Sequence, residues 1–359
     1  MGAATPLSGH DTTRWSRRRI LHLTGLSLLL LIAFLMDITL GSVRIPFRQV
    51  FRILFSMHTD DLTWKYIVEQ IRIPKACTAV LAGCGLSVSG LQMQTLFRNP
   101  LAGPDVLGIT SGASLGVVTI MLSEGSIAAL YTIKELGISG SWLIIGAACV
   151  GAAGIMLLVV TISGRIRNNV MMLIIGVMIG MITQSVISLW QYFSSPELVK
   201  DYLLWTFGSL GGVSGSQLYI LAVVVVIGVV ICFLSSKLLD ALLLGENYAR
   251  SMGLTTQRAR VIIICSTSLL AGGITAFCGP IGFIGVAVPH MARALFNTSS
   301  HRILMPACCL IGTLLMLFCD MIAQLPASQT VLPINVVTSL IGAPVLIWVI
   351  LRKNNLRAT

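Results

Sequence analysis

The side chains that could carry out chemistry in this chain are few and widely scattered. Its 359 residues include 13 acidic residues, five histidines and nine cysteines. A catalytic centre or a metal site needs several such groups at close spacing. Only His290 lies in a dense motif, with Arg293 three residues later, and no Cys-x-x-Cys pair occurs, so the cysteines are expected to be small packing residues. This pattern argues against an enzyme and against a cofactor or metal bound by this chain.

The sequence also lacks the means to hydrolyse ATP. The phosphate-binding loop of many ATPases follows the pattern G-x-x-x-x-G-K-[ST]. This chain contains no Gly-Lys pair at all. Any use of ATP and Mg²⁺ must therefore take place in a separate partner chain.

Polar residues recur at helical spacing inside two apolar segments. Gln184, Ser188 and Gln191 are separated by four and three residues, and Asn335 and Ser339 by four, so each set shares one helical face. Because polar groups that face lipid are costly, we expect these faces to look towards protein or a water-filled path. Hydrogen bonding between packed helices is the alternative.

A polar stretch, FRNPLAGPDVLGITSGA at residues 97–113, interrupts two apolar segments. Pro100 and Pro104 are expected to end one helix and begin the next. Irregular backbone at membrane depth is tolerated only where protein or a cavity covers it, which favours a buried turn beside a pathway over a plain tight loop. We expect its free backbone groups to be bonded by Gln94, Arg98 and Asn99.

The elements that position these residues are apolar helices. The chain is 55% hydrophobic and 10% charged, whereas soluble domains carry about 25% charged residues. A helix of about 20 apolar residues spans a bilayer. The sequence therefore predicts an all-α polytopic membrane protein with about ten transmembrane helices, near residues 20–40, 73–93, 105–122, 141–162, 170–190, 217–235, 261–278, 281–296, 303–325 and 333–351.

The basic residues set the predicted orientation. The net charge of +11 could indicate a nucleic-acid partner, but sixteen of the 24 basic residues fall on one side of this topology, which the positive-inside rule makes cytoplasmic. We therefore expect no nucleic acid, an inner-type membrane, and both termini in the cytoplasm. The predicted organisation is a basic N-terminal segment at 1–19, a single transmembrane domain at 20–351 and a tail at 352–359. The first apolar segment is longer than the apolar core of a signal peptide, so we expect it to be retained as a helix.

Two segments hint at an inverted internal repeat. Leu-Ala-Gly ends at Gly83 and again at Gly272, and in each case a further glycine follows seven residues later, at Gly90 and Gly279. The copies lie in the second and seventh predicted helices, five positions apart, so they would run in opposite directions, as in many transporters. Ordinary helix packing by small residues is the alternative explanation.

Four segments together resemble the FecCD family of permease subunits of ABC importers, which carry ferric siderophores, haem or cobalamin. They are RIPKACTAVLAGCGLSVSGLQMQTLFRNPLAGPDVLGITSGASLG, LLLGENYARSMGL, GPIGFIGVAVPHMAR and LPINVVTSLIGAPVLIWVIL, at residues 72–116, 242–254, 279–293 and 332–351. The resemblance implies ten helices per subunit and two subunits around one pathway. Its matching structural positions are Gln94, Arg98, Asn99, Pro100, Gly103, Pro104, Gly108, Gly279, Pro280, Gly282, Phe283, Pro289, His290 and Arg293.

The resemblance also implies two docking surfaces. The loop at 236–260 would form short coupling helices that dock into the ATPase, through Leu244, Gly245, Glu246, Ala249, Arg250 and Gly253. On the outer face, Arg72 and Lys75 would pair with acidic residues of a substrate-binding protein, where charges mainly steer docking. Anchoring of these two side chains at the membrane interface is the alternative.

A pathway is implied between the fifth and tenth helices. The candidates are Asn168 and Asn169 at the inner mouth, then Gln184, Ser188, Gln191, Asn335 and Ser339. A haem-ligand role for His290 is disfavoured, because Pro-His-x-x-Arg belongs to the family whatever its cargo. The sequence departs from the family pattern at Gln324, Val331 and Asn335, where Arg, an acidic residue and Gly are usual.

The expected function is that of the permease subunit of an ATP-driven importer working by alternating access. Its partners would be a second permease subunit, identical or homologous, two ATP-binding cassette subunits and a substrate-binding protein. The expected cargo is an iron complex, either a ferric siderophore or haem, with cobalamin as the alternative. An ion-coupled secondary transporter is less favoured, because the acids near spans (Asp37, Asp105 and Asp320) are expected at helix edges.

Overall fold

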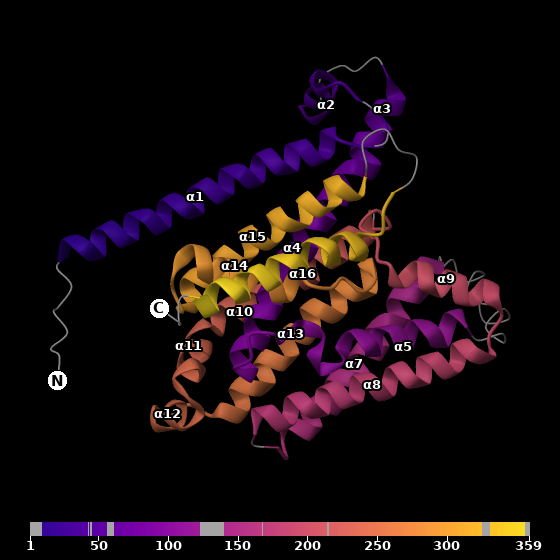
Figure 1. Cartoon of the computed structure of the whole chain (residues 1–359). Helices are drawn as coiled ribbons and strands as arrows, with labels where there is room; N and C mark the ends of the chain where they lie inside the picture. Colours follow the sequence, from indigo (N-terminus) through magenta and orange to yellow (C-terminus); the bar gives the residue numbers. More distant parts are fainter. Residues whose placement is uncertain are drawn as a thin grey trace.

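The computed structural model describes residues 9–41, 43, 45–55, 61–122, 140–166, 168–213, 215–324 and 331–355. In these ranges the chain is built from helices and contains no strand (Figure 1). The longer helices are α1 (Gly9–Thr39), α4 (Ile73–Phe97), α5 (Ile109–Met121), α7 (Gly140–Ser163), α8 (Asn169–Phe193), α10 (Ser216–Leu234), α13 (Thr256–Cys278), α14 (Ile284–Phe296), α15 (His301–Ala323) and α16 (Ile334–Asn355). Short helices are α2 (Phe47–Leu54), α3 (Leu62–Tyr66), η1 (Ile67–Arg72), η2 (Pro104–Leu107), α9 (Pro196–Thr206), α11 (Ser236–Leu244) and α12 (Glu246–Ser251).

The ten predicted spans correspond to the ten longer helices, which confirms the all-α polytopic fold. Within the described ranges, seven helices are long and apolar enough to cross a membrane. Shorter apolar stretches occupy α5, α14 and the Ile334–Trp348 part of α16. The outermost parts of the predicted N-terminal segment and tail, residues 1–8 and 356–359, lie outside the described residues.

The third span is broken, as its glycines and prolines indicated. A 3-10 turn, η2, precedes it, and Gly108 then adopts φ of +75°, a left-handed conformation that glycine tolerates without strain. Helix α5 begins only after this residue. The eighth span, α14, likewise starts late, because Phe283 just before it also has a positive φ.

The packing of the helices follows the predicted inverted repeat. Helix α4 packs against α15, and its counterpart α13 packs against α7. Gly83 of α4 lies against the backbone of Gly312, and Gly272 of α13 lies against Ala152. In each case a glycine lets the second helix of one copy approach the fourth helix of the other copy, as small residues do in membranes.

The second glycine of each copy, Gly90 or Gly279, lies at a different place relative to its helix. Gly90 lies inside α4, where an added Cβ would stand 1.8 Å from the carbonyl oxygen of Gly285. Gly279 instead follows the end of α13, with φ of +74°. The seven-residue spacing that these two glycines share therefore does not reflect the repeat, and only the Leu-Ala-Gly segment does.

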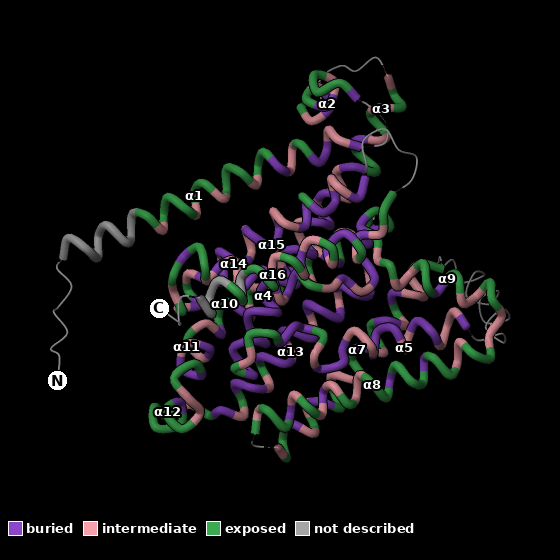
Figure 2. Tube along the Cα trace, viewed as in Figure 1, coloured by how far each residue is buried: buried purple, intermediate pink, exposed green. Residues whose placement is uncertain are grey.

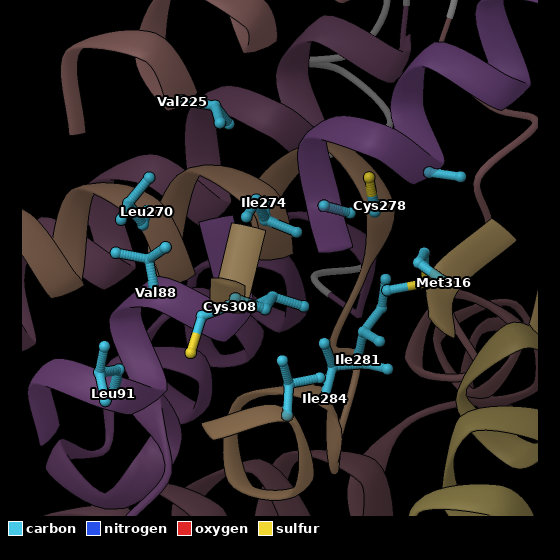
Figure 3. Packing of buried hydrophobic residues seen from close by; sticks show 14 of the residues in the cluster. Val88, Leu91, Val225, Leu270, Ile274, Cys278, Ile281, Ile284, Cys308 and Met316 are labelled. Atoms are coloured by element: carbon cyan, nitrogen blue, oxygen red, sulfur yellow. The ribbon is translucent and has the colours of Figure 1, made fainter. Parts of the chain in front are cut away.

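The core lies where α4, α10, α13 and α15 meet. Figure 3 shows Val88 of α4, Leu270 of α13 and Cys308 of α15 among the buried side chains at this junction. Figure 2 shows that α4 is buried along most of its length, whereas α1 is exposed along most of its described length. Helix α4 therefore forms the centre of the domain, and α1 lies on its edge.

The short helices divide the bundle into two ends. Helices α11 and α12 connect α10 to α13 at one end, which we name the α12 end (Figure 1). Helix α9 connects α8 to α10 at the opposite end, named the α9 end. Because successive spanning helices alternate in direction, α2 and α3, which follow α1, also lie at the α9 end, as does the start of α4.

Candidate functional site

The predicted coupling loop at 236–260 forms two short helices at the α12 end. Gly245 joins α11 to α12 with φ of +124°, and Gly253 follows α12 with φ of +80°. Residues other than glycine rarely adopt these backbone conformations. Ala249 is buried, whereas Leu244 is largely exposed. The last residues of the predicted loop, from Thr256 onwards, already belong to the spanning helix α13.

Glu246 and Arg260 connect the coupling helix to the membrane domain. The Arg260 guanidinium, on α13, is buried and lies 3.1 Å from the Glu246 carboxylate at the start of α12. The same nitrogen, Nη2, donates to Oδ1 of Asn169 over 2.7 Å, and Nη1 donates to the carbonyl of Ile166 over 2.6 Å. Arg250 approaches the other Glu246 oxygen at 3.7 Å and is half exposed. A buried arginine therefore joins α12, α13 and the start of α8.

The paired asparagines lie beside the coupling helix. Asn168 caps α8 by accepting a hydrogen bond from the amide of Val170 over 2.8 Å. Asn169 donates from Nδ2 to the carbonyl of Leu96, near the end of α4, over 2.8 Å. A cleft of about 820 Å³ separates these residues from α12, and its lining includes Arg98, Gly245 and Glu246. The predicted inner mouth and the predicted coupling residues thus lie at one site.

The polar turn after α4 is only partly a buried turn. Residues 98–101 are exposed or half-buried, while Ala102, Gly103 and Pro104 are buried. Arg98 has a positive φ and donates from Nη2 to the carbonyl of Leu242 in α11 over 2.7 Å. The turn therefore contacts the coupling helices directly.

The expectation that three side chains bond the turn's own backbone is correct only for Asn99. Its Oδ1 accepts from the amide of Leu101 over 2.9 Å. Gln94 instead donates to the carbonyl of Val286 in α14 over 3.1 Å, and Arg98 reaches α11. These two side chains bridge helices because the Pro-rich turn satisfies its own backbone with local 3-10 bonds, such as Val106 to Gly103.

His290 and Arg293 of α14 bind this same turn. His290 Nε2 lies 2.7 Å from the carbonyl oxygen of Pro100. Arg293 donates from Nη1 to Oε1 of Gln94 over 2.5 Å. The two signature motifs, far apart in sequence, therefore meet at the α12 end, and the contacts of His290 and Arg293 are structural.

The glycines of this region allow three helices to approach closely. Gly108 lies against Gly180 of α8, with an added Cβ only 3.2 Å from its backbone nitrogen. Gly112 and Gly116 instead face α7, where an added Cβ at Gly116 would stand 2.0 Å from the carbonyl oxygen of Ala147. The close approaches that these glycines allow are therefore divided between two neighbouring helices, α8 and α7.

We expect replacement of Pro104 and Gly108 by leucine to impair transport while leaving membrane insertion intact. The positive φ of Gly108 and the close contact with Gly180 exclude a leucine side chain without backbone movement. Uptake by the double variant in proteoliposomes should fall about tenfold, the rate equivalent of about 1.4 kcal/mol of backbone strain. Normal uptake at equal membrane content would show that the turn is a plain loop.

The second signature forms the turn before α14. Gly279, with positive φ, lies near the carbonyl oxygen of Trp205, so an added Cβ would stand 2.6 Å away. The amide of Gly282 donates to Oδ1 of Asn335 over 3.0 Å. Pro289 is buried inside α14, and Pro280 adjoins the turn where its carbonyl lies near Gly208.

The polar residues of the predicted pathway divide into two groups. Gln184 and Ser188 on α8 are exposed, and Gln191 is half-buried. Asn335 points inwards to Gly282, and Ser339 donates to the carbonyl of Asn335 over 2.6 Å. Asn335 thus makes a contact between separate segments, in line with the alternative interpretation, whereas the Ser339 bond lies within α16. The α8 residues remain open to a neighbouring molecule or a path.

Arg72 and Lys75 are engaged within the chain. Arg72, just before α4, is buried and donates from Nη1 to the carbonyls of Ile38 and Thr39, each over 2.9 Å. Lys75 Nζ lies 2.9 Å from Oδ1 of Asp320 in α15. Neither group is free to meet a binding protein in this conformation, so their docking role stays a prediction that this geometry does not favour.

Asp37 and Asp320 lie near helix ends, as expected, but both are buried there. Both lie within four residues of a helix end, yet they are 2% and 1% exposed. Gln324 bridges them, donating to Asp320 over 2.8 Å and reaching Asp37 at 3.5 Å. With Lys75 and Arg72 they form a group of two acids and two bases, which we name the α9-end charge cluster. Of the positions that depart from the family pattern, Gln324 lies within this cluster and contacts both acids, whereas Val331 is exposed.

A second buried contact involving ionisable groups was not predicted. His301, at the start of α15, is fully buried. Its Nδ1 lies 2.6 Å from Oδ1 of Asp240 in α11, and its Nε2 lies 2.8 Å from the hydroxyl of Thr95. This contact adds a further link between the coupling helices and the core. No spacing in the sequence brings these two residues together, because 61 positions separate them and both lie outside the predicted spans.

Comparison with known proteins identifies what this chain is similar to. The sequence profile of the FecCD transport family matches residues 29–352. The vitamin B12 import system permease protein BtuC of Klebsiella pneumoniae is 36% identical over 344 residues, 96% of each chain. The protein of the same name from Citrobacter koseri is 33% identical over 338 residues, 94% of this chain and 96% of that one.

A solved structure shares the fold described above. It is an ABC transporter of the metal-chelate type in an inward-facing conformation, 27% identical to this chain. The TM-score is 0.78, and the match covers 92% of this chain and 98% of the other. The helices therefore have the same arrangement over nearly the whole length of both proteins.

Proposed function

The chain belongs to the FecCD transport family, and on that premise we propose that it imports cobalamin as the permease subunit of an ATP-driven importer. As a multi-pass inner-membrane permease it is a transport component and not an enzyme. The cargo assignment depends chiefly on the relatives named for vitamin B12 import, which align over almost the entire chain. The expected iron complex is therefore less well supported than the cobalamin alternative.

An iron or other metal chelate is the second candidate cargo. It is supported by the structural neighbour of metal-chelate type, at lower identity than the vitamin B12 permeases. Side chains of the α8 face, such as Gln184 and Ser188, are amides and hydroxyls and not charged ligands. Such groups can line a path for a bulky neutral or charged complex without holding it tightly.

The partners follow from the surfaces left open. Two ATP-binding cassette subunits would dock at the α12 end and would use ATP with Mg²⁺. In this arrangement the α12 end and both termini lie in the cytoplasm. Exposed Leu244 and half-exposed Arg250 are available there for docking. A second permease subunit, identical or homologous, would cover the exposed face of α8. A substrate-binding protein would dock at the α9 end.

The contacts at the α12 end suggest how ATPase motion would reach the pathway. Movement of α12 would pull on Glu246, and through Arg260 on Asn169 at the start of α8. Arg98 carries a parallel link from α11 to the end of α4. Both links end at the predicted inner mouth, so closure of the ATPase would open or close that mouth.

Competition between cargoes tests the assignment. Proteoliposomes would hold this chain with its cognate ATPase and binding protein and would be offered labelled cobalamin, ferric siderophore or haem. We expect cobalamin to accumulate, and unlabelled cobalamin alone to compete with it. Accumulation of a ferric complex with no uptake of cobalamin would transfer the assignment to the second candidate.

A further inference from the structure

Helix α2, at the α9 end, has one face that the rest of the chain leaves uncovered. Val50 and Ile53 are buried against the protein. On the other side, Phe47, Phe51 and Phe55 are 62%, 46% and 61% exposed. These three residues recur every fourth position, so they share one face of the helix and its C-cap. A row of exposed phenylalanines has no role in the transport mechanism described above.

The phenylalanine row is ordered and has a basic edge. The ring centroids of Phe47 and Phe51 are 6.5 Å apart, and those of Phe51 and Phe55 are 4.5 Å apart. Arg48 and Arg52, also four residues apart, lie next to the row on the side away from Val50. The helix thus presents buried aliphatic residues, then exposed aromatic residues, then arginines in sequence around its circumference.

Helix α2 adjoins the end of a predicted membrane-spanning helix. Helix α1 spans the bilayer and ends at Thr39, only eight residues before Phe47. Helices α1 and α2 contact each other, and α1 exposes Leu29, Ile32 and other apolar side chains along the bundle's edge. Figure 1 shows α2 just beyond the end of α1, at the margin of the bundle. Helix α2, which carries the phenylalanine row, therefore adjoins the end of a helix whose outer surface is apolar.

We propose that α2 lies in the membrane interface and binds anionic phospholipid. The three phenylalanines insert between the acyl chains near the headgroups, where apolar faces of amphipathic helices bury. Arg48 and Arg52 bind the lipid phosphates, with which guanidinium groups form charge-assisted hydrogen bonds. This role goes beyond cargo transport, and the orientation proposed above places it in the outer leaflet.

A lipid surface fits this face better than a protein partner does. A binding protein must approach the mouth of the pathway, whereas α2 lies just beyond the end of α1, at the margin of the bundle (Figure 1). The basic edge complements an anionic headgroup layer, and the aromatic row continues the apolar exterior of α1. Docking of the binding protein on α2 is retained as an outcome of the test.

Photo-crosslinking of the full chain in proteoliposomes tests this proposal without cargo or ATP. Phe51 is replaced by p-benzoylphenylalanine in vesicles of phosphatidylcholine and phosphatidylglycerol, with the binding protein present. Leu29, exposed on α1, is the lipid-facing control position, and Glu197, exposed on α9, is the control outside the bilayer. We expect lipid adducts at position 51 in amounts close to those at position 29, and few at 197.

The arginines are tested in the same vesicles. The double change Arg48→Gln and Arg52→Gln should reduce phosphatidylglycerol adducts at position 51 by up to about fivefold per arginine, and leave adducts at position 29 unchanged. Adducts of position 51 with the binding protein, or a yield as low as at position 197, would overturn the interfacial placement. An unchanged yield of phosphatidylglycerol adducts after both arginines are replaced would overturn the proposed contact between the arginines and the headgroups. A failed cargo assignment would alter none of these results.

Discussion

Replacing Arg260 by methionine is expected to lower uptake at least about tenfold while ATP hydrolysis by the assembled importer continues. Arg260 is 3% exposed and joins Glu246 of the coupling helix to Asn169 at the start of α8. Methionine fills similar volume but makes none of these bonds. The motion of α12 would then no longer reach α8, so hydrolysis and transport would be uncoupled.

The measurement is the ratio of cargo imported to ATP hydrolysed in proteoliposomes. Glu246→Gln should lower the same ratio in part, because an amide oxygen can still accept from Arg260 but carries no charge. Arg302, exposed on α15 at the same end, provides the matched control, and Arg302→Met should leave the ratio unchanged. An unchanged ratio for Arg260→Met would show that the link carries no motion.

Replacing Lys75 by methionine is expected to destabilise the folded protein by about 3–5 kcal/mol, the cost of leaving a buried charge without its partner. Lys75 faces Asp320 at 2.9 Å, and the adjacent Asp37 carboxyl is buried as well. Its loss leaves two buried acids with Arg72 as the remaining base of the α9-end charge cluster. The measurement is the midpoint of thermal unfolding in detergent.

Two further variants separate a buried-charge effect from general damage. Lys75→Met combined with Asp320→Asn removes both partners and should recover most of the lost stability. Lys65→Met, which removes a partly exposed i,i+4 pair with Glu69 at 4.0 Å, should cost less than about 1 kcal/mol. Equal losses for Lys75→Met and Lys65→Met would contradict the buried cluster.

The helices of this protein could be predicted because the hydropathy of each segment alone indicates whether it spans the membrane. Every predicted span became a helix, since a bilayer requires the backbone to bond within each segment. The breaks at Gly108 and Phe283 also follow from local sequence, because glycine and proline mark them. The two short helices of the coupling loop were implied by family resemblance and not by periodicity.

The contacts of the site could not be predicted in the same way. Arg260 lies 14 residues from Glu246 and 91 from Asn169, and no spacing rule brings the three together. The acids Asp37 and Asp320 were placed at helix ends correctly, but burial depends on which helices adjoin those ends. Gln94 and Arg98 were assigned to the wrong partners for the same reason, because their partners lie on α14 and α11.

If this permease is driven by ATP through the α12 end, its transport must depend on the partner ATPase. We would measure uptake of labelled cobalamin by proteoliposomes holding the complete importer, with internal ATP or with an imposed proton gradient alone. We expect accumulation with ATP, loss of accumulation when the partner ATPase is catalytically inactivated, and no accumulation from the gradient. Uptake that follows the proton gradient and ignores ATP would contradict this dependence and favour an ion-coupled transporter instead.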